Sequence, residues 1–161
     1  MKNYSESERW MKDAKDCLQH MRDCFKSKYW RGIIQNAQLA IELSIKALIA
    51  LFEEPDWTHN PSKQLIRLIN DRKDEIRKRF NQNMIDALMK TAGDAEIAAP
   101  WHGWSVYGKA KENGTGWIPA VDLCTADVAE DLMRRTERTI VTVEKFLKLA
   151  MPSNESQQTT D

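Results

Sequence analysis

RGIIQNAQLAIELSIKALIALFEE, residues 31–54, is the stretch that decides the fold of this chain. On a helical wheel of about 100° per residue, its polar side chains fall within an arc of about 80°; they are Gln35, Gln38, Glu42 and Lys46. A helix that is apolar over so much of its circumference is surrounded by other elements. A membrane span needs about 20 mostly apolar residues with few charges, which the charged stripe does not fit. We therefore predict the central helix of a helical domain, away from any membrane.

Amphipathic patterns on both sides of this stretch predict the helices that cover it. A first helix is expected over residues 7–28, where Ser5 and Glu8 have the spacing of a capping box. After the central helix, Asn60 and Pro61 have the form of an N-cap followed by a first-turn proline. Because the connection between the first two helices is short, they should be antiparallel neighbours.

The second half of the chain has the same helical character. An amphipathic helix around residues 84–92 is expected to fray over residues 93–99, and Thr125 is the expected N-cap of a long last helix. There is no strand pattern and no repeat. The sequence therefore predicts an all-α, up-and-down antiparallel bundle of four to five main helices. A single domain over residues 1–152 and a disordered tail over residues 153–161 complete this organisation.

The composition excludes some classes of function. Twenty-four basic and 24 acidic side chains give a formal net charge of zero, which argues against tight non-specific nucleic-acid binding, although a local RNA contact stays possible. A near-zero net charge favours self-association. Three cysteines without a CxxC pair, and the polar start MKNYSESERW, predict free thiols and a cytoplasmic location.

A search for known site patterns predicts no metal and no cofactor. No histidine has a glutamate three positions before it, and no Cys/His spacing matches a zinc cluster. The glycines form no phosphate-binding loop. A Ser–His–Asp or Cys–His arrangement stays open, because its members would meet only in space.

Polar groups on the central helix are the first candidate site. Glu42 and Lys46 lie one turn apart with the acid first, the favourable order for an ion pair. Their stripe either faces solvent or a partner subunit, or it lines a cleft where a ligand or second protomer docks. His59 lies in the segment after this helix. It is either a residue that anchors the loop or a catalyst.

An aromatic segment is the second candidate site. No period holds from Pro100 to Asp122, so we expect a long loop, and such loops are often functional. Its aromatic side chains either plug the end of the bundle or form a stacking platform for a base. The residues concerned are Trp101, His102, Trp104 and Tyr107.

Residues 37–52, AQLAIELSIKALIALF, resemble the second helix of HEPN domains, where the pattern A-x4-E-x3-K-A-L is usual. Thr58-His59-Asn60 is similar to the family's start of the third helix. Ser105-Val106-Tyr107-Gly108 is similar in position to its short R-Y motif. The resemblance covers about residues 10–149, and it implies a helical bundle similar to the substrate-binding subunits of nucleotidyltransferases, commonly dimeric.

HEPN members include ribonuclease toxins of toxin–antitoxin systems and accessory domains that work beside small nucleotidyltransferases. The nuclease members carry an arginine, four to six residues, and then a histidine. No arginine stands at that spacing before His20, His59 or His102, and Val106 occupies the place of the arginine in the short motif. The resemblance therefore implies a binding member and not a nuclease.

These observations lead to one hypothesis and two alternatives. The hypothesis is a non-catalytic HEPN-like homodimer that binds a nucleotide or a small nucleotidyltransferase partner. Its predicted binding residues are Glu42, Lys46, His59, Trp101, His102, Trp104 and Tyr107. The first alternative is an RNA-cleaving enzyme with an altered site, in which His102 or His59 is the general base and Lys109, Lys111 or a distant arginine supplies the charge. The second is a purely structural dimerisation module.

Overall fold

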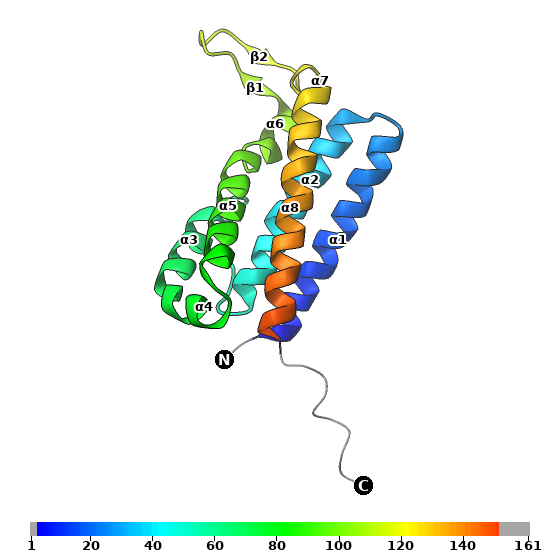
Figure 1. Cartoon of the computed structure of the whole chain (residues 1–161). Coiled ribbons are helices and arrows are strands. Elements are labelled where there is room, and N and C mark those ends of the chain that lie inside the picture. The colour runs from blue at the N-terminus through cyan, green and yellow to red at the C-terminus, as the bar shows by residue number, and fades with distance from the viewer. Residues whose placement is uncertain (1–2, 152–161) are drawn as a thin grey trace.

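The computed structural model describes residues 3–151 of the chain, and it is an antiparallel bundle of helices (Figure 1). The helix and strand bounds are α1 Tyr4–Lys26, α2 Trp30–Ala50, α3 Ser62–Asp71, α4 Lys73–Arg79, α5 Gln82–Ala98, α6 Trp101–Tyr107, β1 Lys109–Ala110, β2 Trp117–Ile118, α7 Ala120–Leu123 and α8 Ala126–Ala150. The predicted all-α bundle is confirmed. The predicted tail, residues 153–161, lies outside the described residues.

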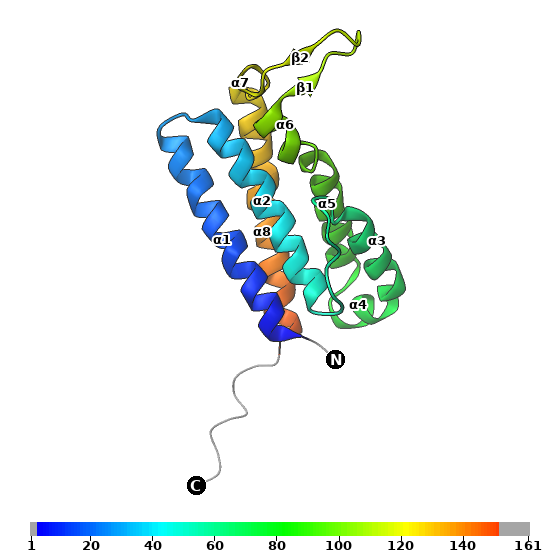
Figure 2. The same ribbon diagram turned by 180° about the vertical axis from the view of Figure 1, so that it is seen from behind.

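Helix α2 lies at the centre of the bundle. It packs against α1 and α8 most extensively, and α5, α6 and α3 cover its remaining surface. Figures 1 and 2 show α1, α2 and α8 side by side, with α5 next to them and α3 and α4 on the outer flank of α5. Fifteen of the 21 residues of α2 are buried, and each fully buried aliphatic side chain contributes about 1.5–3 kcal/mol. The apolar side chains of α2 therefore form the centre of the hydrophobic core.

The same helix is the one element among residues 3–151 that is long and apolar enough to cross a membrane. Seventy-eight per cent of its apolar window is buried inside the bundle. Packing against the other helices accounts for this apolar surface, as expected for a core helix.

A close approach joins α1 to α2. A Cβ atom built on Gly32 would lie 2.4 Å from the ring of Tyr29 and 2.7 Å from Sγ of Cys24. Glycine at this position therefore lets the two helices turn tightly into one another. Cys24, like Cys17 and Cys124, is a free thiol.

Several predicted helix ends are wrong by a few residues. Helix α1 begins at Tyr4, and Asn3 is its cap, because the Asn3 side chain accepts a hydrogen bond from the amide of Glu6. Ser5 is already inside the helix, so it does not form the predicted capping box. Helix α2 ends at Ala50 and not at residue 54, because the amides of Leu51 and Phe52 bond to carbonyls three residues back and tighten the chain into a turn.

Other helix starts agree with the sequence. Helix α3 begins at Ser62, one residue later than predicted, and the Asn60 side chain accepts a hydrogen bond from the Ser62 amide. Thr125 is the N-cap of α8, since its side chain accepts from the amide of Val128. These short polar residues satisfy first-turn amides that the helix itself cannot pair.

Helix α5 runs unbroken through Gly93 to Ala98, so the predicted fraying over residues 93–99 is wrong. A helical glycine costs about 1 kcal/mol relative to alanine. Tertiary packing offsets this cost, because Asp94, Ala95 and Ala98 are all buried against neighbouring elements.

The predicted long loop from Pro100 to Asp122 is also wrong. It holds the two-turn helix α6, an antiparallel hairpin that pairs Lys109 with Ile118, and the one-turn helix α7. These elements are too short for a hydrophobic period to reveal them. At the junction of α6 and β1, Gly108 has a φ of 85°, and a Cβ there would meet the carbonyl oxygen of Ile118.

Candidate functional site

The polar stripe of α2 is buried inside the bundle. Gln38, Glu42 and Lys46 are 2%, 4% and 8% exposed, so the expectation that this stripe faces solvent is wrong for these three residues. The Lys46 ammonium lies 5.4 Å from the ring centroid of Trp10 on α1. Long side chains that carry charge are rarely buried unless they are paired, and this stripe provides the partners internally.

Glu42 is the centre of a hydrogen-bond network. Its Oε1 accepts from Nζ of Lys46 at 2.9 Å, and its Oε2 accepts from Nε2 of Gln38 at 2.9 Å. The third partner is Nδ1 of His59, 3.2 Å from Oε2. A carboxylate has about four acceptor positions, and three donors fill most of them. The buried charge is thereby compensated.

His59 is held in place by contacts from α5. It lies between α2 and α3, in a segment bounded by prolines at positions 55 and 61. Directly after it, Nδ2 of Asn60 and Oγ of Ser62 both donate to Oε2 of Glu96, at 3.0 and 2.5 Å. These hydrogen bonds fix the start of α3 and therefore the position of His59.

His102 comes to the same place from the first turn of α6. Its ring stacks on that of His59, with centroids 3.4 Å apart and an interplanar angle of 15°. Its Nδ1 lies 3.2 Å from Oε1 of Gln38. Burial is the main cause that lowers the pKa of His102, and the charge of the neighbouring His59 acts in the same direction. Both effects favour the neutral form of the His102 ring.

The network assigns the tautomer of His102. An amide oxygen only accepts, so Nδ1 of His102 carries the proton that reaches Gln38. Nδ1 of His59 likewise donates to the Glu42 carboxylate. Among residues 3–151, Nε2 of neither ring has a hydrogen-bond partner. The two rings thus present two nitrogen atoms that the protein itself does not use.

The aromatic residues of α6 have different environments. Trp101 and Trp104 meet edge to face at 5.4 Å, and Trp101 packs against the core. The Lys109 ammonium lies 4.6 Å from the Trp104 ring centroid. Tyr107 is 80% exposed, and at about 100° per residue it lies roughly 140° around α6 from His102. The structure does not bring Tyr107 to the histidine pair.

The other end of α6 is held by a cation. Nε and Nη2 of Arg31 donate to the carbonyl oxygens of Ser105 and Val106 at 2.6 and 3.0 Å. Gln35, the fourth member of the stripe, also donates to the carbonyl of Ser105, at 3.1 Å. A positive charge at a helix C-terminus is stabilising, so α2 fixes the orientation of the helix that carries His102.

One residue of this network, and one exposed aromatic residue close to it in the sequence, were absent from the predicted set. Gln38 links Glu42 to His102, and its place in the stripe, four residues before Glu42, is the signal that would have found it. Trp57 is fully exposed two residues before His59, and nothing in the sequence distinguishes it from a packed tryptophan. Spacing rules also missed that Glu42, His59 and His102 each offer a ligand atom within 4.8 Å of the others. The three residues come from three separate elements.

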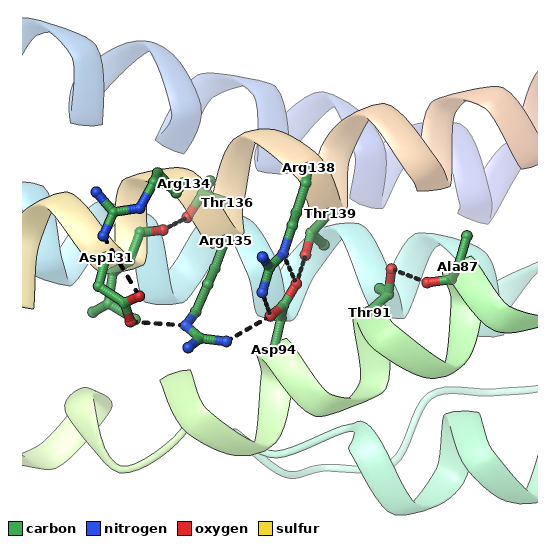
Figure 3. Close-up of polar contacts among 10 residues, drawn as sticks. Ala87, Thr91, Asp94, Asp131, Arg134, Arg135, Thr136, Arg138 and Thr139 are labelled. Atoms are coloured by element: carbon green, nitrogen blue, oxygen red, sulfur yellow. Dashed lines mark hydrogen bonds and ion pairs between the residues drawn. The ribbon is translucent and has the colours of Figure 1, made fainter.

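A second buried acid lies between α5 and α8 (Figure 3). Asp94 is 2% exposed; Nη1 of Arg135 donates to it at 2.9 Å, and both Nε and Nη2 of Arg138 donate as well. Thr139, the residue after Arg138, also donates to Asp94. Arg135 also binds Asp131 at 2.8 Å. Arg135 and Arg138 of α8 both bind Asp94 of α5, and these contacts hold the two helices together.

The geometry defines the class of protein. It is an antiparallel helical bundle whose central helix carries a buried Glu–Lys pair. Two histidines are linked to this pair, one in the loop after the central helix and one at the start of α6. The chain matches the family model of the HEPN domain over residues 7–147, and it belongs to this family. The resemblance that the sequence showed is therefore confirmed. Comparison with curated proteins and with solved structures gives no match.

Proposed function

We propose that this HEPN protein is a non-catalytic binding module that holds a nucleotide against the face formed by His59 and His102. The stacked pair of imidazole rings, each anchored through Nδ1 to the buried Glu42–Gln38 network, is the observation that carries this proposal. Because both rings are fixed before any ligand arrives, little conformational freedom is lost on binding.

Each ring offers chemistry that suits a nucleotide. A free Nε2 accepts a hydrogen bond from a base or sugar, and it donates one to a phosphate oxygen when the ring is protonated. Aromatic surface for base stacking lies two residues before His59, on the exposed indole of Trp57. Base–aromatic stacking contributes about 1–3 kcal/mol per base.

Two observations support binding over RNA cleavage. Phosphoryl transfer places the attacking and leaving oxygens roughly in line, whereas two stacked rings lie on one side of any bound phosphate. The nearby cations are also engaged: Lys46 with Glu42, Arg31 with the carbonyls of α6, and Lys109 with Trp104.

We also propose a homodimer, with the contact at the end of the bundle that carries the hairpin. Large apolar side chains are exposed there on α6, β2 and α7; they are Val106, Tyr107, Trp117 and Val121. Figures 1 and 2 place these three elements together at one end of the molecule. Exposed apolar surface of this kind is typical of interaction sites. Tyr107 therefore belongs to the proposed dimer surface. A small nucleotidyltransferase is the alternative partner for the same surface.

A fluorescence titration tests nucleotide binding. ATP is added to chelator-treated protein while tryptophan emission is followed, with His102→Ala as the site variant and His20→Ala as the matched control. His20 is exposed on α1 and pairs with Asp16. We expect a saturable change in the wild type and in His20→Ala, and its loss in His102→Ala. A flat response of the wild type at millimolar ATP would contradict the proposal.

Two further assays test the rest of the proposal. Incubation with mixed RNA should give no cleavage, and cleavage that is abolished by His102→Ala would establish the enzyme instead. Light scattering should give twice the chain mass of 18.7 kDa, and Trp117→Asp should shift it to the monomer. A wild-type monomer at high concentration would refute the dimer.

A further inference from the structure

We propose that Glu42, His59 and His102 bind one divalent transition-metal ion, a function that goes beyond nucleotide binding and does not depend on it. One carboxylate oxygen and one imidazole nitrogen from each histidine lie within 4.8 Å of one another. They are two nitrogen ligands and one oxygen ligand on a partly open surface. A set of two histidines and one carboxylate binds Zn²⁺ or Fe²⁺ in proteins and leaves coordination positions open.

The distances support an ion between Glu42 and His59. Two ligands bound at about 2.0–2.1 Å in a tetrahedral site lie roughly 3.4 Å apart. Nδ1 of His59 is 3.2 and 3.4 Å from the two carboxylate oxygens of Glu42. An ion that replaces the Nδ1 proton therefore fits between these two groups. The lone pairs of stacked rings lie in nearly parallel planes, so the His102 ring must turn out of the stack to complete the set.

The groups behind Glu42 and His102 have the arrangement of a metal site. Metal-binding histidines usually donate their second ring N–H to a carboxylate, carbonyl or water. Nδ1 of His102 is 3.2 Å from the side-chain oxygen of Gln38, which leaves Nε2 for the ion. Gln38 and Lys46 in turn hold the two oxygens of Glu42 at 2.9 Å. The carboxylate is thus oriented by two donors and keeps acceptor capacity for a cation.

The ligand types select the class of ion. Imidazole suits Zn²⁺, Cu²⁺, Ni²⁺ and Fe²⁺, whereas Mg²⁺ and Ca²⁺ take oxygen ligands. Only one of the three side chains supplies oxygen, so zinc should bind and magnesium should not. His59 has a 58% exposed side chain, so the ion would remain open to water or to a ligand on its outer side.

Calorimetric titration with zinc sulfate tests the site in the full-length protein. We expect one ion per chain, with no heat from magnesium chloride. His59→Ala and His102→Ala should abolish the binding, and Gln38→Leu should weaken it by about 10–100-fold, as for other residues that orient metal ligands. His20→Ala removes the one other histidine of the chain and should leave the affinity for zinc unchanged. Equal affinity in the wild type and in His102→Ala would overturn the proposal.

A measurement on the wild-type protein avoids the risk that a variant fails to fold. Imidazole nitrogen chemical shifts are recorded before and after addition of zinc. The nitrogens of His59 and His102 should move, while those of His20 should stay in place. Binding that survives in His102→Ala and is lost after alkylation of the cysteines would place the ion on thiols and would also overturn the proposal. Because the ATP titration uses chelator-treated protein, failure of the nucleotide proposal and failure of the metal proposal are detected separately.

Discussion

Asp94 on α5 and Glu42 on α2 are the two buried acids among residues 3–151, and their surroundings differ. Asp94 is bound by Arg135 and Arg138, which both come from the long helix α8. The hydrogen bond to Asp94 raises the pKa of Arg138 further, so its charge is permanent. Glu42 is bound by one lysine, one amide and one histidine from a short connecting segment.

The difference lies in what each cluster leaves unused. Arginine carries only donors, and those around Asp94 are directed at acids of α5 and α8, so this cluster joins two helices. Histidine has a second ring nitrogen. His59 and His102 use one nitrogen each on the Glu42 network and keep the other. A buried acid next to histidines thus offers a binding face, whereas one next to arginines offers stability.

Removal of Glu42 should have the largest effect on stability. Glu42→Ala leaves the Lys46 ammonium buried without a counter-charge, and breaking such a buried pair costs about 3–5 kcal/mol. For a domain of this size, that loss lowers the midpoint of thermal unfolding by roughly 10 °C. Thermal unfolding followed by circular dichroism measures it. The double variant Glu42→Ala/Lys46→Met should recover much of the loss; no recovery would show that Lys46 is not the cause.

Removal of Asp94 should cost less. Asp94→Ala breaks the hydrogen bonds of two guanidinium groups, each bond to a charged group being worth about 1.5–3 kcal/mol. The side chains of Arg135 and Arg138 are 21% and 41% exposed, so they turn to water, and we expect a total of about 2 kcal/mol. Urea unfolding measures this loss. ATP and zinc binding should stay at wild-type levels, and a loss of either would remove the distinction between the two clusters.

Removal of His102 should have the opposite result to removal of Asp94: a small loss of stability and a loss of binding. His102→Ala deletes the stacked ring and one hydrogen bond to Gln38, a loss of about 1 kcal/mol. The same variant should lose the binding of ATP and zinc. Urea unfolding and the two titrations, performed on one preparation, give the comparison directly. A loss of stability as large as that of Asp94→Ala, with binding intact, would assign His102 a structural role.

The smallest effect on stability is expected from Glu96. This residue lies two positions after Asp94, but it binds Asn60 and Ser62, which follow His59. Hydrogen bonds from Ser62 and Asn60 lower the pKa of Glu96 from its ordinary value of 4.5. A carboxyl with a lowered pKa in the folded state stabilises the protein above the unfolded-state pKa, and this contribution is lost as the pH falls through the folded-state pKa. The stability difference between the wild type and Glu96→Gln should therefore shrink between pH 6 and pH 3. A difference that does not change with pH would contradict this.

Sequence reasoning was reliable where one helix carries the information. The polar stripe of α2, the Thr125 cap and the helical periodicity all follow from neighbours within a few residues. It was wrong for residues 93–99 and for the predicted loop after Pro100. In the first case tertiary packing extends α5 through Gly93, and in the second the elements are shorter than any period.

The sequence by itself determined that this chain is an all-α bundle built around α2, and its resemblance to HEPN domains gave the family. Only the tertiary structure decided that Glu42 and Lys46 are buried, that His59 and His102 stack, and that Gln38 joins them. Helix periodicity depends on contacts between residues three and four apart. The site depends on contacts between residues 17 and 64 positions apart, which no local pattern records.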